Sequence, residues 1–397
     1  RAAMPVLMLL APWLVHDVLK IPASLREETI LSIHILAWCL PAVLCTGALS
    51  GILESVQRFG RLSLCRFASG MFVYLSPLAV LQFSDNLAWM VGTLAAGRVI
   101  LMLAYLALCY QCFPSLGRAF SIQVRFLKPM LAFGGWLTVS HVVDPLMTFL
   151  DRFMIGAMAS MTAVAYYATP YETITRMWVI PVAISGVVFP AFSAKMTLDA
   201  RSTRVLFDRA VTGVLAPLFL LNLAVVSFAH EGLNLWLGAA FAAESAPVLE
   251  LLAVGVFVNG VIRIPDALIK AAGRPDLISK YHLSEFVVYV PLVWWRTGRY
   301  GIVGTAWAWL LRVCGEAIFI FALSRRYLDR PDAMRRHAAW TAAFALLLLV
   351  LSFVPCGLGV RLTAFLLAAS ACSALLYYLY LPAPDRARLL AVFRRTA

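Results

Sequence analysis

The 397-residue sequence is a succession of long apolar segments separated by short polar ones. A helix needs about 20 predominantly apolar residues to cross the hydrocarbon core of a membrane. Charged residues make up only 13% of this chain, against about 25% in soluble domains. The sequence therefore predicts an all-α, polytopic helical membrane protein. Twelve spans are expected, at 4–19, 30–52, 63–83, 88–112, 129–155, 161–190, 207–230, 246–271, 279–296, 301–324, 337–355 and 360–381.

Basic residues alternate between the two sides of these spans. Loops after even-numbered spans carry 22 Lys and Arg residues, whereas loops after odd-numbered spans carry five. Cytoplasmic loops of membrane proteins are enriched in Lys and Arg, so the even-numbered loops and both ends of this chain are predicted to be cytoplasmic. This asymmetry accounts for the net charge of +13 without a nucleic-acid partner. We expect the basic loops around 113–128, 195–206 and 325–336 to lie on anionic membrane lipid.

Several charged residues fall inside the spans. An Arg at the bilayer centre costs about 2.5–3.5 kcal/mol on insertion scales, so such residues are expected to face water, a ligand or a counter-charge. A rise of about 1.5 Å per residue places Arg98, Arg312 and Glu172 near the midplane and Arg176 one turn deeper toward the cytoplasm. Near the midplane, Arg residues thus outnumber acidic ones. The same count places Asp151, with its neighbour Arg152, at the outer surface.

Helical spacing suggests partners for some of these charges. Three acid–base pairs are three or four residues apart: Glu172 with Arg176, Arg312 with Glu316, and Arg263 with Asp266. Spacing alone leaves open whether these pairs only neutralise one another or form a site. Arg98 has no acidic residue within one turn, so its partner must come from another helix or a ligand. Asp144 is a candidate for binding H⁺ or Na⁺ or for pairing with an Arg, and Glu285 is a further ion-site candidate.

Motifs of enzymes and cofactor-binding proteins are missing from the sequence. It contains no G-x-S-x-G, P-loop, H-E-x-x-H or Gly-rich nucleotide fingerprint. Cys109 and Cys112 form a C-x-x-C without a second pair, which gives little support for a metal or redox site. The longest external loop, near 231–245, holds barely a dozen residues. We therefore expect a protein that is not an enzyme and that uses no cofactor or metal.

The stretch from Lys128 to Lys195 resembles the O-antigen and polysaccharide flippases, lipopolysaccharide biosynthesis proteins of the multidrug/oligosaccharidyl-lipid/polysaccharide exporter superfamily. The residues carrying this resemblance are Phe133-Gly134, Trp136, Pro145, Asp151-Arg152-Phe153, Ile155-Gly156, Tyr166-Tyr167, Pro170, Glu172, Pro181 and Phe189-Pro190. The run GALSGILESVQRFG at 47–60 is similar to the same family.

The resemblance implies two pseudo-symmetric six-helix lobes that form a V-shaped cavity, followed by two extra helices. Twelve spans equal fourteen less the first two, and the chain begins with Arg1, so the natural N-terminus is expected to be missing. The implied organisation is 1–112 as four spans of the first lobe, 113–128 as a cytoplasmic linker, 129–324 as the second lobe, 325–336 as a basic cytoplasmic loop, 337–381 as two additional spans and 382–397 as a basic cytoplasmic tail.

The functional hypothesis is a flippase of the bacterial inner membrane. It would move an undecaprenyl-pyrophosphate-linked oligosaccharide to the periplasmic leaflet by alternating access, with possible contact to polysaccharide assembly proteins. Guanidinium groups suit a pyrophosphate because they offer a planar donor fork and stay charged. Arg98, Arg176 and Arg312 would bind this head group. Asp144, Glu172 and Glu316 would pair with charges or bind a coupling H⁺ or Na⁺, and Pro170 and Pro181 would let span 161–190 bend.

Two rival functions stay open. A cation-coupled multidrug exporter of the same superfamily should have a net acidic cavity, whereas Arg predominates near the midplane here. A membrane-embedded polysaccharide polymerase or ligase should carry a large external loop with clustered Arg and His residues, and no such loop occurs in this sequence.

Overall fold

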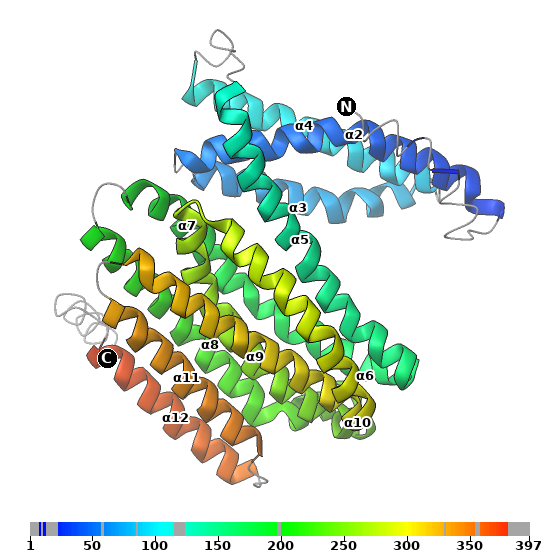
Figure 1. Cartoon of the computed structure of the whole chain (residues 1–397). Coiled ribbons are helices and arrows are strands. Elements are labelled where there is room, and N and C mark those ends of the chain that lie inside the picture. Colours follow the sequence, from blue (N-terminus) through cyan, green and yellow to red (C-terminus); the bar gives the residue numbers. More distant parts are fainter. Residues whose placement is uncertain are drawn as a thin grey trace, which may run out of the picture. The chain divides into compact units, whose positions relative to one another are not determined.

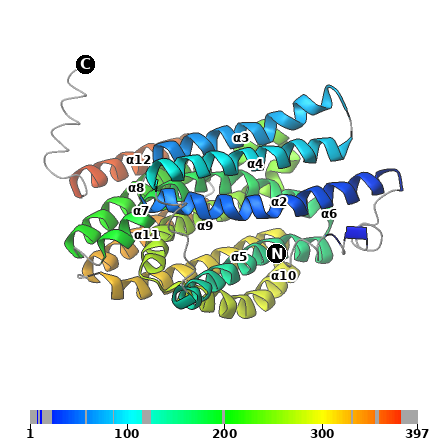
Figure 2. The same cartoon turned by 90° about the horizontal axis from the view of Figure 1, so that it is seen from above.

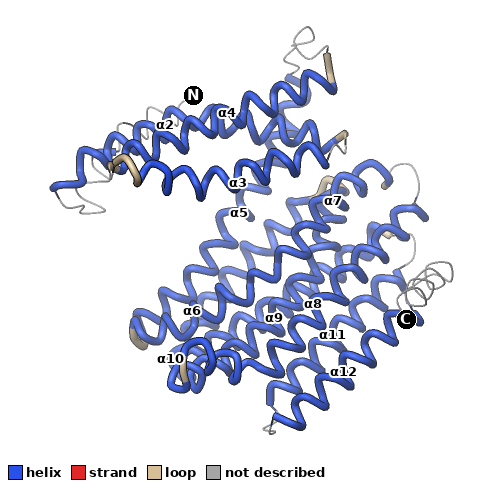
Figure 3. Tube along the Cα trace, turned by 180° about the vertical axis from the view of Figure 1, so that it is seen from behind, coloured by secondary structure: helices blue, strands red, loops and turns tan. Residues whose placement is uncertain are grey.

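The computed structural model describes residues 8, 11–12, 23–56, 59–84, 86–114, 124–196, 200–328, 331–353 and 358–379. Every regular element within these ranges is a helix, and none is a strand (Figure 3). Eight helical runs among them are long and apolar enough to cross a membrane. The prediction of an all-α, multi-pass fold is therefore confirmed. Most of the predicted span 4–19 and all of the tail 382–397 lie outside the described residues.

The chain divides into two compact units, residues 1–123 and 124–397. The N-terminal unit contains α2 (Ala23–Ser55), α3 (Phe59–Leu81) and α4 (Leu87–Cys112), and both α2 and α3 pack against α4 (Figure 2). The side chain of Asn86 caps α4 by accepting a hydrogen bond from the Ala88 amide. A small core of Leu53, Leu62, Tyr105 and Cys109 joins the three helices. The predicted lobes and linker stay predictions.

The C-terminal unit contains the remaining elements (Figure 1). They are α5 (Val124–Met158), α6 (Met161–Thr175), the 3₁₀ turn η2 (Arg176–Trp178), α7 (Val179–Lys195), α8 (Ala200–Leu237), α9 (Ala239–Ala271), α10 (Pro275–Ser324), the 3₁₀ turn η3 (Arg325–Tyr327), α11 (Pro331–Phe353) and α12 (Leu358–Leu379). Both α11 and α12 pack against α8.

Helix α9 is the centre of this unit. Every residue from Leu251 to Ile262 is buried, because α6, α7, α8, α10 and α11 all pack around the helix. A helix that is apolar on all sides is stable in such a position. Gly255 permits close approach of α10, since a Cβ atom there would lie 2.1 Å from the ring of Trp309.

Helix α10 contains two arms that fold back on each other. The spans predicted at 279–296 and 301–324 correspond to a first arm, Pro275–Tyr300, and a second arm, Gly301–Ser324. The reversal occurs at Gly301, whose φ of 57° and ψ of −142° are readily available only to glycine. The hydroxyls of Thr297 and Thr305 lie 2.8 Å apart across the turn. The reversal makes side chains of the two arms face each other.

Two other connections differ from or refine the sequence analysis. The predicted span 161–190 is broken by η2, because Pro181 has no N–H to bond the carbonyl of Met177 and the chain tightens into a 3₁₀ turn. The prediction of an external loop at 231–245 is wrong. Helix α8 extends to Leu237 and α9 begins at Ala239, so that only Gly238, with a φ of 89°, separates them.

Candidate functional site

A cluster of charged side chains lies where α5 meets the two arms of α10. The Arg312 side chain is only 5% exposed. Its Nη1 lies 3.4 Å from Glu285 Oε2 on the facing arm and 3.9 Å from Asp144 Oδ1 on α5. The Tyr289 ring centroid is 5.5 Å from the guanidinium carbon, a distance typical of a cation–π contact. Arg312 is thus held by two carboxylates and one aromatic ring.

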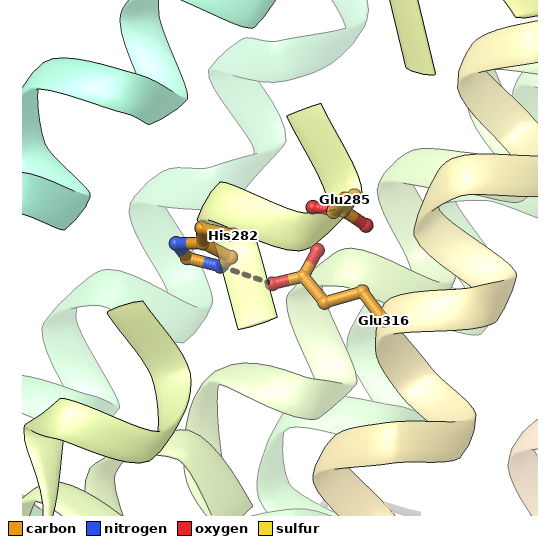
Figure 4. A group of neighbouring side chains, drawn as sticks. All are labelled: His282, Glu285 and Glu316. Carbon is orange, nitrogen blue, oxygen red and sulfur yellow. Dashed lines mark hydrogen bonds and ion pairs between the residues drawn. The ribbon is translucent and has the colours of Figure 1, made fainter. Parts of the chain in front are cut away.

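His282 and Glu316 lie next to Glu285 and extend the cluster (Figure 4). The Nε2 atom of His282 lies 3.3 Å from Glu316 Oε1, and the amide of Asn259 on α9 donates to Glu316 Oε2 over 3.5 Å. Ligand atoms of His282, Glu285 and Glu316 all lie within 4.8 Å of one another. Within the described part of the chain, the buried atoms His282 Nδ1 and Glu285 Oε1 have no hydrogen-bond partner. This set of donors is suited to holding a proton or a small cation.

The cluster separates two cavities. One has a volume of about 70 Å³ and is strongly polar. Its polar lining residues are Ser140, His141, Asp144, Asn259, Arg263, Asp266, Lys270, His282 and Glu316. The other has a volume of about 280 Å³ and is lined by Glu285, Tyr289 and Arg312, among others. Both arms of α10 line both cavities or the cluster between them, so movement of one arm against the other would change both cavities.

Asp151 is fully buried, with 0% of its surface exposed. Its predicted depth at the outer surface of the membrane stays a prediction. The hydroxyl of Tyr167 on α6 donates to Asp151 Oδ2 over 3.1 Å, and the hydroxyl of Tyr289 on α10 donates to Asp151 Oδ1. Helices α6 and α10 cover this turn of α5, which a count of residues from a span end cannot reveal.

None of the three pairs predicted from helical spacing forms among the contacts that the structure describes. Arg312 pairs with Glu285 and Asp144, while the predicted partner Glu316 binds His282. Three of the other four residues have different partners: Glu172 binds Arg152 over 2.5 Å, Asp266 binds Lys270 over 2.6 Å, and Arg263 contacts Asn259 Oδ1 over 3.4 Å and the Trp178 ring. Asp266 and Arg263 thus keep helical spacing within α9 but with other partners, whereas Arg312, Glu316 and Glu172 pair with residues of a facing helix or arm.

Two of the predicted head-group residues are exposed. Arg176 belongs to η2, and Arg98 is on α4 of the N-terminal unit. Neither forms an ion pair with any residue that the structure describes. The guanidinium of Arg312 is instead already neutralised. The structure thus does not bring Arg176 and Arg312 together. Arg98 belongs to the other compact unit.

The charges that line the two cavities are nearly balanced. Arg312, Arg263 and Lys270 supply the positive charges, whereas Asp144, Glu285, Glu316 and Asp266 supply the negative ones. The prediction that Arg outnumbers acid near the membrane midplane stays a prediction. His282, Asn259 and Tyr289 were missed altogether. The sequence offered one signal for His282: it lies three positions before Glu285, so both side chains are on one face of the helix.

Comparison with known proteins identifies similar sequences. Residues 4–196 match the family described as polysaccharide biosynthesis protein. A putative O-antigen transporter of Shigella flexneri is 29% identical over 306 residues, which cover 76% of this chain and 71% of that protein. This chain is similar to that putative O-antigen transporter. The resemblance seen in the sequence is thereby confirmed. The lipopolysaccharide biosynthesis protein WzxC of Escherichia coli K12 is 28% identical over 189 residues, 47% of this chain and 37% of that protein.

Solved structures show the same fold. A MATE transporter in complex with MaD3S matches with a TM-score of 0.68 at 16% identity, over 84% of this chain and 76% of that one. The lipid II flippase MurJ in an inward closed conformation matches with a TM-score of 0.56 at 11% identity, over 94% of this chain and 81% of that one. At these identities the likeness concerns the fold. The fold is thus one found in multi-pass membrane transporters.

Proposed function

We propose that this chain is a flippase that moves an undecaprenyl-pyrophosphate-linked oligosaccharide, the repeat unit of a surface polysaccharide, from the cytoplasmic to the periplasmic leaflet of the bacterial inner membrane. The observation that carries the proposal is the cluster of buried Arg312, Glu285 and His282 with partly exposed Glu316 and Asp144, inside a bundle of membrane-spanning length. Such a cluster is costly in a membrane and marks a path for ions or charged substrates. The relationship to an O-antigen transporter supports the choice of substrate.

The cluster supports a division of roles among the proposed site residues. Arg98 and Arg176 are exposed and would attract the pyrophosphate first. Arg312 would contact it only in a state in which Glu285 and Asp144 release the guanidinium. Binding of H⁺ or Na⁺ among Glu285, Glu316 and His282 would weaken that hold, because it removes negative charge facing Arg312. Glu172, which binds Arg152 here, would act as a charge-pairing residue between α5 and α6.

The orientation and the remaining partners belong to the same proposal. Both ends of the chain would face the cytoplasm, because 22 of the 27 Lys and Arg residues assigned to loops and tail fall on that side. The basic loops would lie on anionic lipid, and assembly proteins of the polysaccharide would be further partners. No enzymatic step is proposed, since the relatives named above with a stated activity are transporters and a flippase.

Complementation tests this function. The full-length protein should restore surface polysaccharide to a strain that lacks its own flippase, and Arg98→Ala or Arg312→Ala should not. Arg335→Ala is the matched control, because the Arg335 side chain is 66% exposed and outside the cluster. Membrane levels of every variant are measured by immunoblotting. Restoration of normal polymer by both alanine variants would contradict the cationic head-group site.

A second function is favoured by the acidic balance of the cluster. Carboxylates around one buried Arg would suit a cation-coupled exporter of cationic drugs, and MATE transporters share the fold. Cells that express the protein would then expel a lipophilic cationic dye, and Glu316→Gln would abolish that efflux. Dye efflux without restoration of polysaccharide would support the exporter. Restoration of polysaccharide without dye efflux would support the flippase.

A further inference from the structure

An apolar groove with a volume of about 490 Å³ runs between the second arm of α10 and α11, with α9 at its base. Small side chains create it. Five alanines line it: Ala317, Ala322, Ala338, Ala342 and Ala345. Larger apolar residues border it, including Leu310, Ile318, Phe321, Leu346 and Leu349. Facing alanines leave the space between two antiparallel helices unfilled, so a furrow remains along their contact.

The dimensions of the groove select the kind of occupant. Its lining extends from Leu310 on α10 to Arg325 in η3, which corresponds to about 22 Å at 1.5 Å per residue. The side chains along this length are almost all apolar. A groove of this length and lining suits an extended hydrocarbon chain.

One end of the groove is positively charged. Arg325, in η3, is exposed and lines the groove, and it forms no ion pair with any residue that the structure describes. The rest of the lining is apolar apart from Cys314 and Thr341, and the Thr341 hydroxyl already donates to the His337 carbonyl over 2.8 Å. An apolar furrow that ends at an unpaired guanidinium is complementary to an amphiphile with an acidic head.

We propose that this groove binds an anionic membrane phospholipid, with one acyl chain between α10 and α11 and its phosphate on Arg325. The length fits, because about 22 Å exceeds the depth of one leaflet, which is roughly half of the 30 Å hydrocarbon core. The inference does not depend on the proposed flippase activity, since the groove lies apart from the charged cluster.

Native mass spectrometry of the purified full-length protein in detergent tests the site. Phosphatidylglycerol is titrated against phosphatidylcholine. Arg325→Gln should weaken phosphatidylglycerol binding by at least about tenfold, as expected for the loss of a hydrogen-bonded charge contact. Arg326→Gln is the matched control, because Arg326 is the next residue of the same turn and does not line the groove. It should bind phosphatidylglycerol like the parent protein.

A second pair of variants tests the groove itself. Ala342→Phe places a ring in the furrow and should abolish retention of phosphatidylglycerol. Ala343→Phe is its control, because Ala343 is exposed on α11 and does not line the groove. Equal binding of both lipids by the parent protein would overturn the head-group contact, and unchanged binding by Ala342→Phe would overturn the groove. Retention of undecaprenyl phosphate instead of phosphatidylglycerol would also overturn the proposal.

Discussion

Removing the carboxylate of Glu285 should destabilise the protein more than removing any exposed charge. At 3.4 Å, two unit charges interact by about 5 kcal/mol at an effective dielectric constant of 20. The Glu285 and Arg312 side chains are 6% and 5% exposed, so little solvent screens them. Asp144 is 45% exposed and lies 3.9 Å from Arg312. It can replace only part of the lost attraction. We expect Glu285→Gln to lower the free energy of unfolding by about 3–5 kcal/mol.

The double replacement sharpens this prediction. Arg312→Met alone leaves Glu285 buried without its partner and should also cost about 3–5 kcal/mol. The variant with both Arg312→Met and Glu285→Met contains neither buried charge, so its loss should be far smaller than the sum of the two single losses. The coupling energy from this double-mutant cycle measures the pair. Reversible unfolding in mixed detergent micelles, followed by circular dichroism, provides the free energies.

An exposed pair on the same unit provides the control. Arg335 and Asp332 lie 3.9 Å apart with side chains 66% and 86% exposed, and such pairs contribute about 0–1 kcal/mol. The same cycle at these two positions should give almost no coupling. The reasoning would be refuted if Glu285→Gln cost no more than Asp332→Asn, or if the losses at Arg312 and Glu285 were additive.

Three further predictions concern the packing around the cluster. Tyr289→Phe removes one of the two hydroxyls that donate to buried Asp151 and should cost about 1.5–3 kcal/mol of unfolding free energy in the same assay. Gly301→Ala places a side chain where φ is 57° and should cost about 1–3 kcal/mol, visible as a lower melting temperature. Gly255→Ala drives a methyl group into the Trp309 ring and should cost about 1–3 kcal/mol, with a changed tryptophan emission spectrum as an independent readout.

The sequence predicted helices well because one physical requirement dominates in a membrane. Backbone groups must be bonded within the segment, so a long apolar run can only be a helix. The ends of such runs were less certain. The segment 231–245 contains Glu231, Asn234 and Glu244, which made it resemble a loop, yet α8 and α9 continue through it with only Gly238 between them. Polar residues near a span end are compatible with helix, and a single glycine is enough for the reversal.

The candidate site was predictable only in part. Arg312 and Glu316 stood out because charges in an apolar span are costly, and both belong to the cluster. Their partners did not follow from spacing, since Glu285 and His282 reach them only because α10 reverses at Gly301. The reversal brings residues 27 and 34 positions apart into contact. The spacing of residues along one helix does not predict contacts between the two arms. These contacts can be seen only in the folded structure.

The contact between α5 and α10 provides a direct test of whether these helices move during transport. The hydroxyls of Ser140 and Ser279 lie 2.8 Å apart, and Ser279 also donates to the Trp136 carbonyl over 2.5 Å. Two cysteines at these positions should therefore form a disulfide after little rearrangement.

The ion pairs of Arg312 join the same helices, since Asp144 is on α5 and Glu285 on α10. We expect Ser140→Cys with Ser279→Cys to stop oligosaccharide translocation in proteoliposomes when oxidised and to recover when reduced. Each single variant under the same oxidant controls for the native cysteines. If the cross-linked protein translocated as fast as the protein with its disulfide reduced, α5 and the first arm of α10 would move as one body. The release of Arg312 would then have to come from movement of the second arm of α10.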